Sequence, residues 1–176
     1  MQRSEIEHVI RASGDIADDD KIVIIGSQSI LGEYPDAPAG LLASMEADIY
    51  PMNKPELAEK VDGAIGEGSS FHAEFGYYAQ GVSPKTATLP DGWDKRLIAI
   101  QNGDTRGVTG LCLEAHDLAV SKYVAGRPKD FEFIGELVRH KMIEREILLQ
   151  RLSKTDLPEP GRLKVKRRIE ASFKNG

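Results

Sequence analysis

The sequence predicts an α/β (α+β) protein, with a small mixed sheet flanked by helices and a helical part at its C-terminal end. Three observations support this prediction. The continuous apolar stretch at residues 22–25 is typical of a strand that is covered on both faces. A second short apolar stretch, at 46–50, has acids at alternate positions, which fits a strand. From Glu114 onward, apolar residues recur at helical spacing.

Turn and capping residues divide the N-terminal part into short elements. Gly26-Ser27 follows the first strand, and Asn53 precedes Lys54-Pro55, an arrangement that is common where helices begin. In chain order we expect a helix at 2–12, a solvated aspartate turn at 18–20, a strand at 22–26, a short helix at 27–31, a loop at 32–43, a strand at 46–50, a helix at 54–65, and strands at 71–82, 96–101 and 108–113.

The C-terminal part is predicted to be helical throughout. The pattern indicates helices at 115–125, 129–140 and 144–152, a linker at 157–161, and a basic terminal helix with Val165, Ile169 and Phe173 on one side. We therefore expect a core at 1–113, a helical part packed on it at 114–157, and a basic C-terminal segment at 158–176.

The composition is that of an ordinary globular protein. The 176 residues are 40% hydrophobic and 29% charged, and a chain of this size buries roughly 70% of its unfolded surface. No apolar run approaches the ~20 residues of a membrane span, and the first residues lack a signal-peptide pattern. Cys112 is the single cysteine, which excludes an internal disulfide and a multi-cysteine zinc site. We expect a cytoplasmic protein that does not enter a membrane.

The charge is distributed unevenly along the chain. Residues 151–176 contain eight basic and three acidic residues, a net charge of +5. The net charge of the whole chain is −5, so residues 1–150 have a net charge of −10. An acidic body argues against general coating of nucleic acid, whereas the basic end can hold a polyanion locally.

Two features point to nucleotide chemistry. In a strand, residues i and i+2 face the same side, so Glu46 and Asp48 project together. Two adjacent carboxylates suit a divalent cation that prefers oxygen ligands, such as Mg²⁺. The Gly26-Ser27 turn, between a strand and a helix, offers backbone N–H groups to a phosphate. Together these residues predict a site for a nucleoside triphosphate with Mg²⁺.

The order of these residues resembles the signature of the nucleotidyltransferase fold that is associated with DNA polymerase beta: a Gly-Ser turn, a spacer, then two acids one residue apart. The later segment at 117–130, with Lys122 on a helix and Arg127 and Asp130 behind it, resembles the nucleotidyltransferase-like proteins of bacterial type IV toxin–antitoxin systems. The resemblance covers residues 20–140. It implies transfer of a nucleoside monophosphate to an RNA such as tRNA, or to a protein acceptor, and an antitoxin as a partner.

The resemblance also implies a role for each residue of the motifs. Polymerase-like members often have a third metal-binding acid on a later strand, and here Glu74 and Asp104 both remain open. The implied assignments are Gly26 and Ser27 for the triphosphate, Glu46 and Asp48 for Mg²⁺, Lys122 for a phosphate, and Asp130 for orienting Lys122 or joining the acidic cluster.

Each motif also has a plain structural interpretation. A Gly-Ser turn after a strand is often only a turn, and the two acids could form the exposed face of an edge strand. Lys122 could be one lysine on an amphipathic helix. Glu114 and the nearby His116 lie where a helix begins, so stabilisation of its N-terminal dipole is favoured over metal binding.

The leading hypothesis is an Mg²⁺-dependent nucleotidyltransferase, and two alternatives stand beside it. The first is a catalytically inactive nucleotide-binding or regulatory module of the same fold. It is favoured by the 18 residues between Ser27 and Glu46 and by Glu, rather than Asp, as the first acid. The second is a nucleic-acid-binding protein that acts through the basic residues at 162–174, which otherwise form a terminal helix packed on the body.

Overall fold

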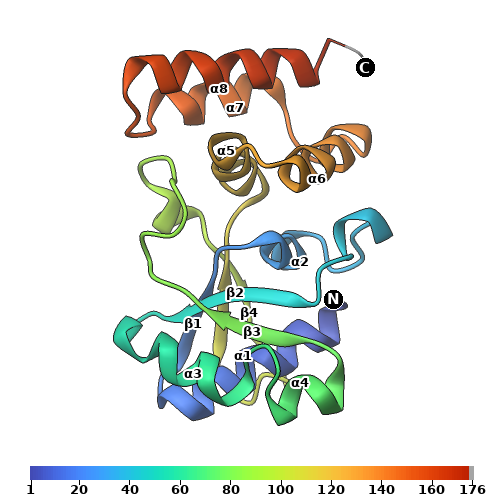
Figure 1. Cartoon of the computed structure of the whole chain (residues 1–176), viewed down its shortest axis with the longest axis vertical. Helices are drawn as coiled ribbons and strands as arrows, with labels where there is room; N and C mark the ends of the chain where they lie inside the picture. The colour runs from blue at the N-terminus through green and yellow to red at the C-terminus, as the bar shows by residue number, and fades with distance from the viewer. Residues whose placement is uncertain (175–176) are drawn as a thin grey trace.

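The computed structural model describes residues 1–174 and contains a five-stranded mixed sheet with the strand order β3-β2-β1-β5-β4 (Figure 1). The central strand β1 is parallel to β5 and antiparallel to β2, β2 is parallel to β3, and β4 is antiparallel to β5. The strands are β1 (Lys21–Ile24), β2 (Glu46–Pro51), β3 (Tyr78–Gly81), β4 (Ile98–Ile100) and β5 (Thr109–Cys112). The predicted fold class, a mixed sheet with flanking helices and a helical C-terminal part, is confirmed.

The central strand is buried on both faces, as its continuous apolar sequence predicts. Its residues Ile22, Val23 and Ile24 are almost completely buried. Ile24 lies opposite Ile49 of β2 and Cys112 of β5. Burial raises the pKa of the Cys112 thiol to about 12, so this cysteine is an unreactive core residue.

Helices cover both faces of the sheet. One face packs against α1 and α3, and the other against α2, on which α5 of the helical part packs in turn. In Figure 1, α1, α3 and α4 lie at one end of the molecule, and α7 and α8 lie at the other. The helices are α1 (Arg3–Ala17), α2 (Ile30–Glu33), α3 (Ala58–Ile65), α4 (Ser70–Phe75), α5 (Ala115–Ala125), α6 (Pro128–Arg139), α7 (Arg145–Ser153) and α8 (Glu159–Ser172), with 3₁₀ turns η1 (Ser27–Ser29), η2 (Ala39–Leu41), η3 (Pro55–Leu57) and η4 (Trp93–Arg96).

The basic terminal helix α8 packs on the body through the face that the sequence predicts. Val165 and Ile169 are buried, and Phe173 packs partly against the core. On the same helix, the Arg168 guanidinium donates hydrogen bonds to the backbone carbonyls of Tyr123, at 2.6 Å, and Val124, at 3.5 Å. These carbonyls belong to the last turn of α5, so α8 satisfies the C-terminal end of that helix.

The boundaries of the three expected parts stay a prediction. Strands β1 to β5 and helices α1 to α4 fall within 1–113, and α5 to α7 fall within 114–157. The last part, 158–176, contains α8, and its final residues, 175–176, lie outside the described residues.

The strand expected at 71–82 is wrong in its first half. Residues Ser70–Phe75 form α4, and only Tyr78–Gly81 form a strand. The Ser69 side chain accepts a hydrogen bond from the His72 N–H, and Gly76 ends the helix at a φ of 77°. These two caps decide the conformation, because the four-residue spacing of Phe71 and Phe75 fits either periodicity.

The expectation of a solvated aspartate turn at 18–20 is wrong for its middle residue. Asp19 is buried and accepts hydrogen bonds from the backbone N–H groups of Lys21, Asn53 and Lys54. Burial opposes ionisation, but these bonds hold the pKa of Asp19 below its usual value. Asp19 therefore joins the start of β1 to the end of β2.

Other boundaries also differ from the expectation. The strand expected at 96–101 is limited to Ile98–Ile100, because Trp93–Arg96 form the 3₁₀ turn η4. The first helix continues to Ala17 and ends where Asp18 takes a left-handed conformation at a φ of 50°. Within this helix Gly14 leaves room for Val108, because an added Cβ would lie 2.5 Å from a Val108 methyl group. The expected linker at 157–161 is shorter, because α8 already begins at Glu159 with Pro160 in its first turn. Within the described residues, no helix has both the length and the apolar character to cross a lipid bilayer.

Candidate active site

A cavity of about 740 Å³ lies between strands β2 and β3 and helices α5 and α6. The loop at 86–88 closes one of its sides. The structure brings all the sequence-predicted site residues to this cavity, although they come from distant parts of the chain; their roles there stay predictions. The residues are Gly26, Ser27, Glu46, Asp48, Lys122 and Asp130.

The two acids lie on a strand that is covered, not on an edge. β2 is the second strand of the sheet, and β3 pairs with its outer side. Glu46 and Asp48 point to the cavity, whereas Ala47 and Ile49 are buried on the other face. The alternative in which both acids form the exposed face of an edge strand is therefore wrong.

The surroundings of Asp48 disfavour its ionised form. Burial, followed by the charge of the adjacent Glu46 carboxylate, raises the pKa of Asp48 to about 6. The positive charges of Lys122 and Lys129 lower it, but by less. A divalent cation bound by both carboxylates removes this repulsion, because its charge favours the ionised form of each acid.

Two side chains of β3 hold Glu46 in place. The Tyr78 hydroxyl donates a hydrogen bond of 3.1 Å to Oε2 of Glu46. The Gln80 amide, with its nitrogen turned toward Glu46, donates to both carboxylate oxygens at 3.0 and 3.1 Å. Burial and the hydrogen bond to Glu46 raise the pKa of Tyr78 to about 12, so it remains a donor. Sequence reasoning missed both residues, because finding them needs the register of β3 beside β2.

The Gly26-Ser27 turn and β2 fit closely together. The N–H of Ile25 donates to the backbone carbonyl of Asp48 at 3.1 Å. A Cβ placed on Gly26 would lie only 2.0 Å from Oδ2 of Asp48. Glycine at this position therefore leaves space for the Asp48 carboxylate.

Lys122 connects this turn to the helical part. It lies on α5, and its Nζ donates to Oγ of Ser27 at 2.8 Å. The same nitrogen is 3.5 Å from Oδ1 of Asp130 and 4.5 Å from the ring centre of Phe133. Burial lowers the pKa of Lys122, and the charge of Asp130 opposes that shift. The ammonium group is thus held at the cavity wall.

Asp130 holds Lys122 and the start of α6 together. It is fully buried and accepts hydrogen bonds from Nε and Nη2 of Arg127, at 2.9 and 3.2 Å, and from the Arg127 backbone N–H at 3.0 Å. Burial opposes ionisation, but these bonds keep the pKa of Asp130 below its usual value. Arg127 and Lys129 also line the cavity. Sequence reasoning gave neither a role, although both lie within three residues before Asp130.

The long spacer between the turn and the acids builds a wall of the cavity. It contains α2 and η2, and Gly40, Leu41 and Ser44 line the cavity. Gly40 lies against α6, where an added Cβ would be 2.7 Å from the Glu136 carboxyl carbon. The extra length therefore packs under the helical part.

No third acid completes a metal cluster within residues 1–174, where no group of three or more His, Cys, Asp or Glu side chains is placed to hold a metal. Neither Glu74, in α4, nor Asp104, in the turn before β5, lines the cavity. Magnesium commonly uses one or two carboxylates together with phosphate oxygens and water. The Glu46–Asp48 pair beside the Gly26-Ser27 turn fits such an ion.

Comparison with known families gives a match at residues 4–166 to a family described as nucleotidyltransferase of unknown function (DUF6036). The chain belongs to this nucleotidyltransferase family. The match includes every residue of the cavity, so the resemblance to nucleotidyltransferases is confirmed at the level of the family. Neither a curated protein nor a solved structure matches the chain. The resemblance to toxin–antitoxin proteins stays a prediction.

Proposed function

We propose that this member of the nucleotidyltransferase family transfers a nucleoside monophosphate from a nucleoside triphosphate, with Mg²⁺, to an acceptor hydroxyl on RNA or protein. One observation carries the proposal: the acid pair of β2 and the Ser27–Lys122 pair face the same cavity. The carboxylates can bind a divalent cation, and the hydroxyl and ammonium groups can bind the phosphates that carry it.

Glu46 and Asp48 hold the metal ion in this proposal, with Tyr78 and Gln80 fixing the Glu46 carboxylate. When bound, Mg²⁺ neutralises charge on the phosphates and orients them for in-line displacement. Ser27 and Lys122 bind the triphosphate, and Lys122 supplies a point charge from a buried position. The protein thus contributes mainly positioning and charge.

The transfer step follows from this arrangement. The acceptor oxygen forms a bond to the α-phosphorus, while the bond from that phosphorus to the bridging oxygen breaks. Pyrophosphate leaves with the electron pair, and the proton of the hydroxyl passes to solvent. Arg127 and Lys129, at the cavity, stabilise the negative charge of the leaving group.

The test is Asp48→Ala, measured by calorimetry with nucleoside triphosphate and Mg²⁺ and by radiolabel transfer to cell RNA and protein. We expect Mg²⁺-dependent binding and transfer to be lost without a fall in melting temperature, because Asp48 is held in a repulsive site. A large loss of stability would show that Asp48 is structural and contradict the proposal.

The alternative is a nucleotide-binding or regulatory module of the same fold without catalysis. Two acids stand here where many polymerase-like enzymes have three acids, which favours this alternative. Gln80, not an acid, lies opposite Asp48 in the register of β2 and β3. Binding of triphosphate with Mg²⁺, without transfer to any RNA or protein acceptor, identifies this alternative.

A toxin role with an antitoxin partner is the cellular context that the resemblance supplies. Induced expression in a bacterial host tests it. Growth arrest with the wild-type chain and normal growth with Asp48→Ala at equal protein levels would support a toxin that acts through the cavity. Normal growth with both chains would contradict it.

A further inference from the structure

A positively charged strip runs along the surface from the cavity to α8. It begins with Arg127 and Lys129 at the cavity and continues with Arg168, Lys164 and Arg167 of α8. Arg168 links the two ends, because its guanidinium lies against Gly126, next to Arg127; a Cβ on Gly126 would be 2.3 Å from Nη1 of Arg168. Arg168 therefore connects the basic residues at the cavity with those of α8, and Glu132 of α6 is an acid beside this path at the cavity.

The α8 part of the strip contains no acid, because the acidic residues of this helix lie on other sides of it. Lys164 and Arg168 are four residues apart, and Arg167 is three from Lys164, so all three are neighbours on the helix surface. The helix's acids lie elsewhere: Glu170 is paired with Arg145 of α7 at 2.6 Å, and Glu159 lies near Arg162 at 3.6 Å. The flank toward α7 is thus mixed in charge, and the flank toward α6 is basic.

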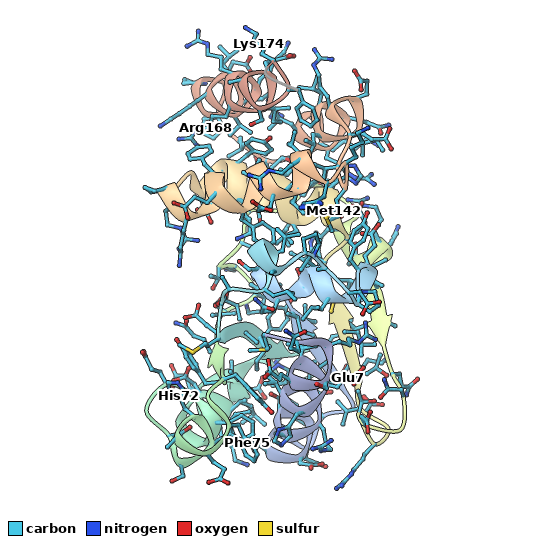
Figure 2. The ribbon with its side chains drawn as sticks, turned by 90° about the vertical axis from the view of Figure 1, so that its right-hand side faces the viewer. Glu7, His72, Phe75, Met142, Arg168 and Lys174 are labelled. Carbon is cyan, nitrogen blue, oxygen red and sulfur yellow. The ribbon has the colours of Figure 1, made fainter. Side chains whose placement is uncertain are left out.

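An exposed aromatic ring lies within this strip. Phe131, on α6, is 38% exposed, and the Arg168 guanidinium carbon lies 5.4 Å from its ring centre. Figure 2 shows Arg168 between α8 and α6. Phe173, the aromatic residue of the basic stretch, packs partly against the core, whereas α6 supplies an exposed ring. An exposed ring beside arginine and lysine side chains is the combination that binds single strands, by base stacking and phosphate contacts.

We propose that the acceptor is the end of a single-stranded polynucleotide, which extends from the cavity past Arg127, over Phe131, to Lys164 and Arg167. Its terminal hydroxyl then lies in the cavity, and its following nucleotides lie along the strip. This inference rests on the proposed nucleotidyl transfer, because the strip leads to the cavity in which that transfer would occur.

The test measures binding of a fluorescent 20-nucleotide RNA of mixed sequence by anisotropy at two salt concentrations, with DNA of the same sequence as a second arm. The variants are Phe131→Ala and the double variant Lys164→Glu/Arg167→Glu. We expect each to weaken binding about tenfold or more, and the double variant to lower the salt dependence of binding as well. A double variant with the same change of charge at exposed lysines outside the strip, Lys60→Glu/Lys95→Glu, is the control and should bind as the wild type does.

The outcomes separate this inference from the proposed function. Calorimetry with triphosphate and Mg²⁺ should give wild-type binding for all the variants, because none of the altered residues lines the cavity. The inference would be overturned if the strip variants bound RNA and DNA with wild-type affinity. It would also be overturned if the wild-type chain transferred label to protein alone and bound neither RNA nor DNA measurably. Loss of polynucleotide binding only in the strip variants supports it, and the arm with the tighter binding identifies RNA or DNA. If the strip binds RNA but no triphosphate binds with Mg²⁺, the proposed transfer fails and the binding surface stands.

Discussion

Replacing Gly26 by alanine tests whether the position of Asp48 determines activity. An added Cβ would lie 2.0 Å from Oδ2 and 2.8 Å from Cγ of Asp48. An ordinary contact is at least 3.4 Å, so the carboxylate oxygen must move by about 1.4 Å or the strand must shift. Because Cγ is also too close, rotation of the carboxylate alone is not enough; rotation about the Cα–Cβ bond of Asp48, which moves both Cγ and the oxygen, is the easier response.

The expected effect of Gly26→Ala is a loss of activity that far exceeds the loss of stability. A misplacement of roughly 1 Å in a reacting group can lower the rate about 100-fold. We therefore expect label transfer to fall about 100-fold and Mg²⁺-dependent triphosphate binding to weaken, with a melting temperature within a few degrees of the wild type.

The matched control is Gly63→Ala. Gly63 lies inside α3, and an added Cβ there meets no atom within 4 Å. Alanine should stabilise this helix by about 0.5–1 kcal/mol and leave binding and transfer unchanged. Wild-type metal-dependent binding and transfer in Gly26→Ala would refute the reasoning, because the close approach of the turn to Asp48 would then have no consequence.

Three further predictions follow from buried charges. Asp48→Asn should raise the melting temperature at pH 7.5 by a few degrees. The pKa of Asp48 is raised to about 6 in the folded state, so its ionisation destabilises the fold as the pH rises from about 4 through 6, and asparagine carries no charge. The gain should shrink at pH 5 in thermal scans without metal, and an equal gain at both values would contradict this account. Lys122→Met should weaken triphosphate binding about 10- to 100-fold in calorimetry, because it removes a charged donor beside Ser27 while Arg127 still pairs with Asp130. Lys60→Met is the control. Wild-type affinity of Lys122→Met would exclude a contact between Lys122 and phosphate. Asp117→Ala should lower the free energy of unfolding by about 3–5 kcal/mol in denaturant titrations. The reason is that Asp117 is fully buried and pairs with Arg96, at 2.8 Å, and Arg151, at 3.3 Å. A change below about 1 kcal/mol would show that the two arginines find other partners.

The elements that sequence reasoning located well are those with strong local signals. The central strand has an uninterrupted apolar run, and α5 was placed at its observed bounds because Glu114 caps its start and Gly126 ends it at a φ of 63°. The acid pair and Lys122 were found because their order along the chain resembles a known signature. Local patterns of this kind are visible without knowledge of the fold.

The features that sequence reasoning missed depend on contacts between distant segments. Asp19 is buried because Asn53, far along the chain, supplies its hydrogen bonds. Gln80 reaches Glu46 because β3 pairs in parallel with β2, a register that sequence alone does not give. Phe131 joins the basic residues of α8 because α6 and α8 pack together. In each case neither partner has a distinctive local pattern.

The bonds from Arg168 to the carbonyls of Tyr123 and Val124 tie the far end of the polypeptide to the helix that carries Lys122. A chain cut ahead of α8 would leave those carbonyls without their donor and would expose the apolar surface that Val165 and Ile169 now cover. Proteolytic removal of α8 should therefore disturb α5, the helix that carries Lys122, so the terminal segment is an integral support of the cavity wall rather than a detachable appendage.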